Sequence, residues 1–174
     1  MTNYRRACVP GASWFFTLNL AERKDNRLLI DNIDVLRTAF RYVKARHPFP
    51  MDTVVVLPDH MHCIWTLPPG DADFSTRWNL VKGHFSRAKG ERISDSRGKR
   101  RERGVWQRRF WEHLLCDQDD FNRHVDYLHW NPVKHGWVQR VMDWPHSSFH
   151  TFVEAGAYSL NWGCPSITDI RAGE

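Results

Sequence analysis

Two histidines one residue apart, His60 and His62, are the side chains of this chain best suited to chemistry. They lie in the stretch VVVLPDHMHCIWTL, whose apolar, aromatic and β-branched residues are typical of a strand. Because positions i and i+2 of a strand point to the same face, the two imidazoles would project together from a stiff support. Imidazoles placed in this way can supply two ligands of a divalent metal. The alternative is an ordinary pair of polar residues on a strand.

A second set of reactive side chains lies further along the chain, around the sequence YLHWNP. Tyr127 and Asn131 are four residues apart and share a helix face if the last turn holds, and His124 lies on the same side. We expect this helix to lie against the strand of the histidine pair. That contact would bring two imidazoles, an amide oxygen and a phenol to one point. The alternative places the tyrosine in the core and lets the asparagine end the helix.

These four groups together suit phosphodiester chemistry. Two imidazoles and a carbonyl oxygen form a mixed nitrogen and oxygen site with open positions, which suits Mg²⁺ or Mn²⁺ bound together with a phosphate. Such a metal polarises the phosphoryl oxygen, and a tyrosine oxygen is a competent nucleophile once its proton is removed. Attack on DNA would leave a phosphotyrosine and a free hydroxyl. The bond energy would be kept, so the strand could be rejoined.

The rest of the pattern predicts the elements that position these side chains. Helical spacing of apolar residues predicts helices over 31–46 and 73–89. An N-cap at Asp117 predicts a third helix that ends near Trp130, because the residue before Pro132 disfavours helix. Strands are expected over 14–20, 52–57, 61–67 and 106–116, and the tail from 137 has no clear pattern. This order of elements indicates an α+β fold, a mainly antiparallel sheet with helices packed on it.

Composition limits the class of protein. At 174 residues the chain fits one domain, 1–174, in which we expect residues 164–174 to form a flexible tail. Its four cysteines are scattered and form no C-x-x-C pair, which argues against a zinc ribbon and against a disulfide framework. The chain shows no signal-peptide pattern and no apolar run long enough for a membrane span. A reduced cytoplasmic setting, associated with the nucleoid, is expected.

One short segment carries the whole excess of positive charge. Residues 97–109 read RGKRRERGVWQRR, with seven basic residues and one acid, whereas the chain as a whole carries a net charge of +5. Nucleic-acid phosphate is the natural partner of such a patch, and a solvated loop without a partner is the alternative. If several of these side chains contact phosphates, hairpin affinity should fall steeply with rising salt. The candidate DNA-binding residues are Arg97, Lys99, Arg100, Arg101, Arg103, Arg108 and Arg109.

The motifs together resemble those of a known family, the REP-associated tyrosine transposases, which are relatives of the single-tyrosine HUH transposases. HUH stands for histidine, a hydrophobic residue and histidine, and His60-Met61-His62 matches it within LPDHMHCIWTLPPGD. The phrase YLHWNPVKHGWV resembles the family's tyrosine helix and its Asn-Pro-Val exit. FFTLNL, RRERGVWQRRFWEH and WPHSSFHTFV also look like this family, so the resemblance extends from Tyr4 to about Gly163.

The resemblance implies a role for each candidate residue. His60 and His62 match the metal-binding pair, Tyr127 matches the nucleophile, and Asn131 takes the place of the third ligand, where relatives can carry glutamine. The implied fold is that of the HUH endonucleases, a ferredoxin-like or RRM-like core in which helices pack on one face of a small antiparallel sheet. The implied activity is metal-dependent cleavage and rejoining of single-stranded hairpin DNA, at palindromic repeats, through a 5′-phosphotyrosine link. A monomer is favoured, and a homodimer is the alternative.

Two other functions remain open from the residues alone. A non-catalytic protein that binds hairpins or single strands would keep the fold and the basic segment, but it would not need His60, His62, Tyr127 and Asn131 together. A metal-dependent hydrolytic nuclease would activate water and use Tyr127 for packing. A covalent protein–DNA adduct distinguishes the transposase from both alternatives.

Overall fold

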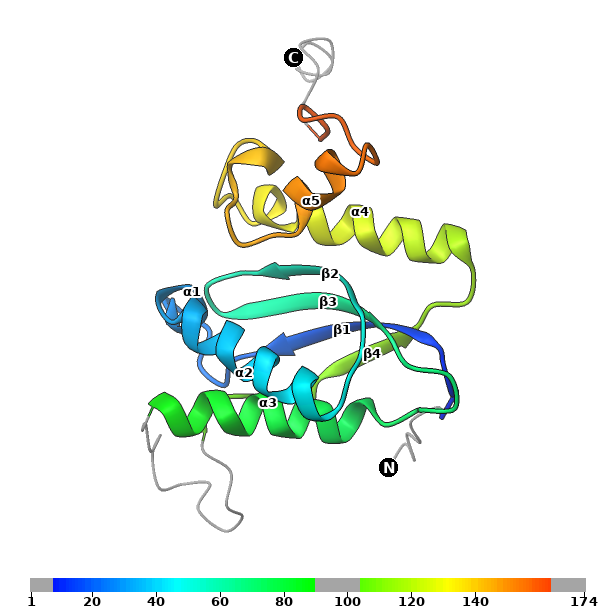
Figure 1. Cartoon of the computed structure of the whole chain (residues 1–174). Coiled ribbons are helices and arrows are strands. Elements are labelled where there is room, and N and C mark those ends of the chain that lie inside the picture. The colour runs from blue at the N-terminus through cyan, green and yellow to red at the C-terminus, as the bar shows by residue number, and fades with distance from the viewer. Residues whose placement is uncertain (1–7, 90–103, 164–174) are drawn as a thin grey trace, which may run out of the picture.

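Four antiparallel strands form the sheet that carries the histidine pair. The computed structural model describes residues 8–89 and 104–163, and the strands pair in the order β2-β3-β1-β4 (Figure 1). Their bounds are Ser13–Asn19 for β1, Met51–Val56 for β2, His60–Thr66 for β3 and Trp111–Leu114 for β4. The predicted α+β class with an antiparallel sheet is confirmed. β4 is shorter than the predicted strand 106–116, because Trp106 forms an isolated bridge to Leu20.

Helices flank this sheet on two sides. The longer ones are α2 (Ile33–Arg46), α3 (Phe74–Lys89) and α4 (Gln118–Lys134), and shorter ones are α1 (Leu28–Asp31), the 3-10 helix η2 (Val141–Asp143) and α5 (Phe149–Glu154). The helices predicted over 31–46 and 73–89 are confirmed as α2 and α3. η2 and α5 lie in the tail, where the sequence showed no pattern. Among the described residues, no helix has both the length and the apolarity that crossing a bilayer requires.

Alternation along the strands separates two apolar clusters. In β3, Met61, Cys63 and Trp65 belong to the cluster of α2 and α3, in which the rings of Trp65 and Trp78 stack 4.0 Å apart. Ile64 belongs instead to the cluster on the opposite face. Since strand residues alternate between faces, His60 and His62 lie on the face of Ile64 and away from α2 and α3.

The helix α4 covers the face that carries the histidines. Its buried Val125 and Leu128 pack with Phe15, Val55 and Ile64 of the sheet. Figure 1 shows the sheet between α3 and α4. Helices therefore cover both faces of the sheet, because α4 has an apolar stripe of its own. The family resemblance implied helices on one face. This second layer brings α4 to the histidine pair.

The start of α4 follows its sequence signal. The Asp117 carboxylate accepts a hydrogen bond from the backbone nitrogen of Asp120, at 2.7 Å, which confirms the predicted N-cap. The hairpin between β2 and β3 is confirmed as well, and the backbone nitrogen of Leu57 donates to the His60 carbonyl across its turn.

The predicted end of α4 near Trp130 is wrong, because the helix continues through Pro132 to Lys134. Its end is set by Gly136, which has a φ of 71° in the left-handed region that favours glycine. The nitrogen of Trp137 donates to the Pro132 carbonyl and that of Gly136 to the Val133 carbonyl, both at 2.9 Å, which is a Schellman motif. Proline is tolerated this close to the end, and the extra turn adds side chains to the site.

Candidate active site

A cavity of about 580 Å³ lies between the sheet and α4. From the sheet it is lined by Phe15, Thr17, Asn19, His60, His62 and Trp111. Arg23 lines it from the segment between β1 and α1, and α4 with its C-cap contributes Arg123, His124, Tyr127, Lys134 and His135. The structure thus brings together the predicted histidine pair and the predicted tyrosine. The cavity wall does not include Asn131.

The two imidazoles of the pair are held by their Nδ1 atoms. The ring centroids of His60 and His62 lie 5.1 Å apart. His60 Nδ1 donates to Asp59 Oδ1 at 2.6 Å, and His62 Nδ1 lies 2.8 Å from Thr17 Oγ1. In the tautomer whose Nδ1–H donates to these partners, each Nε2 keeps its lone pair. A histidine whose other nitrogen is fixed by a carboxylate or a hydroxyl is typical of a metal ligand.

Burial also suits the pair to metal binding. It lowers the pKa of both imidazoles, and the neighbouring His60 adds to the effect on His62, whose pKa falls to about 3. The Asp59 carboxylate opposes this fall at His60. Both rings are therefore neutral at neutral pH, which is the form that coordinates a metal. The donor set fits the divalent metal that the sequence predicted.

Replacing Thr17 with valine should weaken metal binding about 10- to 100-fold while keeping the fold. The change removes the hydroxyl at His62 Nδ1 and preserves the branched shape of the side chain. Calorimetric titration with Mn²⁺ measures the effect. Thr66→Val is the matched control, because Thr66 pairs with Ser13 and Asp52 away from the cavity. Equal losses in both variants would contradict the role of the hydroxyl.

Tyr127 projects from α4 into this cavity and is not a core residue. Its side chain is 39% exposed, and its ring meets His62 edge-on at 5.6 Å. Lys134 Nζ lies 3.5 Å from the phenol oxygen and 4.7 Å from the ring centroid. The ring of His135 lies 5.2 Å from that of His60. Sequence reasoning missed Lys134 and His135 because it ended the helix too early, although Gly136 marks its real end.

The chain is similar in sequence and in fold to proteins of a known family. It is 47% identical to the REP-associated tyrosine transposase of Escherichia coli, over the whole chain and 98% of the relative. The chain belongs to the REP-associated tyrosine transposases. A Haemophilus influenzae protein of the same kind is 42% identical over 94% of each chain. The solved structure of a REP-associated tyrosine transposase bound to a REP hairpin matches with a TM-score of 0.84, at 46% identity over 100% of this chain and 98% of the other. No family model matches the chain.

The asparagine of this transposase lies where the sequence did not lead us to expect it. Asn131 is fully buried, and neither its Oδ1 nor its Nδ2 has a hydrogen-bond partner among the described residues. A buried amide without a partner costs roughly 1–3 kcal/mol, so this position calls for an explanation. A role of its Oδ1 as a metal ligand would explain the unpaired amide. The ligand role of Asn131 stays a prediction.

Asn131→Leu separates a ligand from a packing residue. If Asn131 serves the metal, the variant should bind Mn²⁺ at least about 10-fold more weakly, while its metal-free form should be as stable as the parent or more stable, because an unpaired amide is removed. Urea denaturation with and without Mn²⁺ measures both quantities. Unchanged Mn²⁺ affinity would remove Asn131 from the ligand set.

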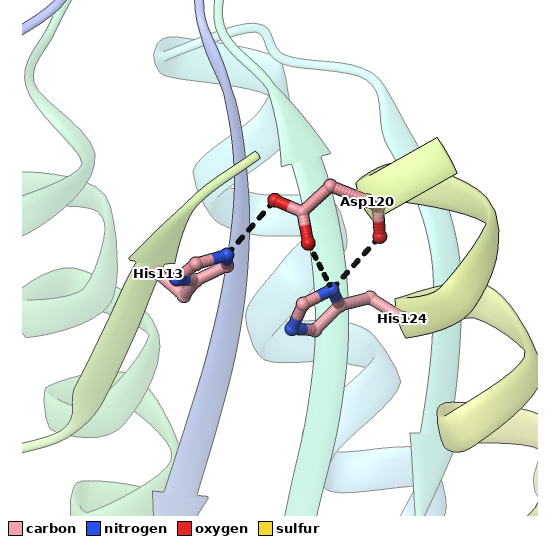
Figure 2. Close-up of side chains that lie close together, drawn as sticks. All are labelled: His113, Asp120 and His124. Carbon is pink, nitrogen blue, oxygen red and sulfur yellow. Dashed lines mark hydrogen bonds and ion pairs between the residues drawn. The ribbon is translucent and has the colours of Figure 1, made fainter. Parts of the chain in front are cut away.

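A second polar cluster lies beside the cavity of the transposase, where β4 meets α4 (Figure 2). The ligand atoms of His113, Asp120 and His124 all lie within 4.8 Å of one another and could hold a metal ion. Their geometry favours a hydrogen-bond network, because the two rings stack at 4.7 Å with planes only 21° apart and so do not aim at one point. Sequence reasoning chose His124 but missed the other two as partners.

The hydrogen bonds of this cluster orient His124 in the cavity wall. His113 Nε2 donates to Asp120 Oδ2 at 2.9 Å, and this bond is the main cause that lowers the pKa of Asp120 to about 2. His124 Nδ1 donates to the Asp120 carbonyl at 2.8 Å and lies 3.2 Å from its carboxylate. Figure 2 shows both imidazoles turned toward this one aspartate. The anion thereby fixes the ring that lies above Phe15 at 4.8 Å.

Most of the predicted DNA contacts fall outside the described residues. Arg97, Lys99, Arg100, Arg101 and Arg103 belong to that group, and the segment 164–174, predicted as a tail, also lies outside the described residues. Arg108 and Arg109 are described and exposed on the segment before β4. The cavity itself adds Trp111, which is 53% exposed and lies against Phe15. Exposed aromatic rings of this kind stack on unpaired bases.

Proposed function

We propose that the protein is a metal-dependent single-stranded DNA endonuclease and transposase, which cleaves and rejoins hairpin DNA through a 5′-phosphotyrosine intermediate. One observation carries the proposal: the accessible phenol of Tyr127 lies against His62 in a cavity where two imidazoles keep Nε2 available. A relative that is 46% identical was solved bound to a REP hairpin, which supports hairpin DNA of this kind as the substrate.

The residues divide the work in this proposal. His60 and His62, with Asn131 as the predicted third ligand, would hold Mg²⁺ or Mn²⁺, which when bound polarises a phosphoryl oxygen. Tyr127 attacks the phosphorus, loses its phenol proton and becomes covalently joined to the 5′ phosphate, while the 3′ oxygen leaves as a hydroxyl. Arg23, Arg123 and Lys134 line the cavity and place positive charge near the phosphate.

The test is adduct formation with a labelled REP hairpin that carries single-stranded flanks. With Mn²⁺ or Mg²⁺, the parent protein should yield a slow band on a denaturing gel, and a chelator or Tyr127→Phe should abolish it. Tyr42→Phe is the matched control, because Tyr42 is also 39% exposed but lies on α2, away from the cavity. If Tyr42→Phe forms the adduct and Tyr127→Phe does not, Tyr127 is the nucleophile.

Other results would select other functions. Free cleavage products that persist in Tyr127→Phe would indicate a hydrolytic nuclease with a structural tyrosine. Tight hairpin binding without cleavage under any metal would indicate a non-catalytic DNA-binding protein. Light scattering of the protein with and without the hairpin tests the proposal of a monomer against a homodimer.

A further inference from the structure

We propose that Lys134 is a further catalytic residue, whose ammonium group stabilises negative charge on the Tyr127 oxygen. The inference rests on the proposed tyrosine chemistry and assigns this reaction a residue beyond the histidine pair and the nucleophile. Lys134 would act in both directions, as the phenol attacks the phosphate and as it leaves again when the strand is rejoined.

The contact between the two side chains is specific. Lys134 Nζ lies 3.5 Å from the Tyr127 oxygen and 4.7 Å from the centroid of its ring. Seven residues make about two helical turns, so the two side chains project from the same side of α4. This alignment exists because the helix passes through Pro132 and ends at the Gly136 Schellman motif. A helix that stopped at Trp130 would not bring the lysine to the phenol.

The charges around the cavity single out Lys134. Of the three cationic side chains that line it, Arg23 pairs with Asp59 at 2.6 Å, and Arg123 pairs with Asp120 at 3.4 Å. Within residues 8–89 and 104–163, no carboxylate lies within ion-pair distance of Lys134. No carboxylate in this described part of the chain therefore compensates its positive charge, which faces the reacting phenol. A fixed cation at a developing oxyanion lowers the barrier of the step that creates the charge.

The step balances without further reagents. Attack forms the bond from the Tyr127 oxygen to phosphorus and breaks the bond from phosphorus to the 3′ oxygen. The phenol proton passes to solvent, and the departing 3′ oxygen takes a proton from solvent. Lys134 keeps its three protons throughout and donates a hydrogen bond to the tyrosine oxygen. In rejoining, the 3′ hydroxyl attacks and the tyrosine oxygen leaves toward the same ammonium group.

The experiment measures single-turnover adduct formation at saturating hairpin and Mn²⁺. Lys134→Met should lower the rate of adduct formation about 10- to 100-fold and should lower the rate of strand rejoining by the same factor. Lys134→Arg, which keeps the charge, should retain most of the rate, and added ethylamine should restore activity to Lys134→Ala. Lys44→Met is the matched control, since Lys44 is exposed on α2 away from the cavity, and it should react at the parental rate.

A substrate with sulfur in place of the 3′ bridging oxygen identifies the oxygen on which Lys134 acts. Sulfur leaves readily without help, so a lysine that assists the leaving group becomes dispensable, whereas one that assists the phenol does not. A persisting deficit of Lys134→Met on this substrate supports the proposal, and a restored rate overturns it. If Lys134→Met reacts at the parental rate on the ordinary substrate, the role of Lys134 is overturned too. In that case the adducts that the parent protein forms still support the proposed function. Failure of the parent to form adducts would overturn both.

Discussion

Replacing His62 with alanine should lower the rate of metal-dependent adduct formation on the order of 1,000-fold, because the several kcal/mol that a metal contributes to a phosphoryl transition state correspond to about that factor. The side chain is 4% exposed, its Nδ1 is held by Thr17, and its ring touches that of Tyr127. Hairpin binding should persist, since the cationic side chains around the cavity remain. A native gel and a single-turnover assay at saturating hairpin separate the two quantities.

A high concentration of Mn²⁺ distinguishes a lost ligand from a damaged fold. If His62→Ala binds metal weakly through His60 and the remaining donors, raising Mn²⁺ should recover part of the rate, whereas a misfolded protein would not respond. His150→Ala is the control, because His150 is exposed and bonds to the Met142 carbonyl outside the cavity. A parental rate for His62→Ala would show that the histidine pair does not serve the reaction.

Local pattern was enough to predict the histidine pair. The two-residue period of β3 determines that His60 and His62 share a face, and this holds for any strand that keeps its pleat. Local pattern could not identify the element that faces them, because that depends on which face each helix covers. The tyrosine was placed correctly because α4 has apolar residues of its own, Val125 and Leu128, that pack on the sheet beside the pair.

The errors at the end of α4 have a physical cause. The rule that a residue before proline avoids helix is local, and here the Schellman motif at Gly136 and the packing of the last turn outweigh it. Because of that error, sequence reasoning missed Lys134 and His135. The same geometry explains Asn131: residues four apart lie about 40° apart around a helix, enough for Tyr127 to reach the cavity while Asn131 is buried.

The cluster around Asp120 was out of reach for a different reason. His113 comes from β4, and His124 comes from α4, with the N-cap of the helix between them. The sequence marks Asp120 as an acid in the first turn of a helix, which has a sufficient explanation in the helix dipole. Its second role appears only when the edge strand and the helix are placed side by side, as in Figure 2.

Phe15 links the stability of the fold to the geometry of the site. It is 2% exposed, and its ring lies 5.4 Å from His62, 4.8 Å from His124 and 6.1 Å from Tyr127. Phe15→Ala should destabilise the protein by about 3–5 kcal/mol, the usual loss for a buried phenylalanine. Without the Phe15 side chain, the rings of His62, His124 and Tyr127 would no longer be held in place. A misplacement of reacting groups near 1 Å can reduce the rate of a reaction about 100-fold.

The neighbouring residue offers a control of equal size on the opposite face. Phe16 is fully buried against Trp65 and Trp78, in the cluster of α2 and α3. Phe16→Ala should lose a similar free energy of unfolding, measured in urea, but at a temperature where both variants are folded it should form adducts near the parental rate. Phe15→Ala should then be about 100-fold slower than Phe16→Ala. Equal rates in the two folded variants would show that Phe15 supports the core and does not position the rings of the cavity.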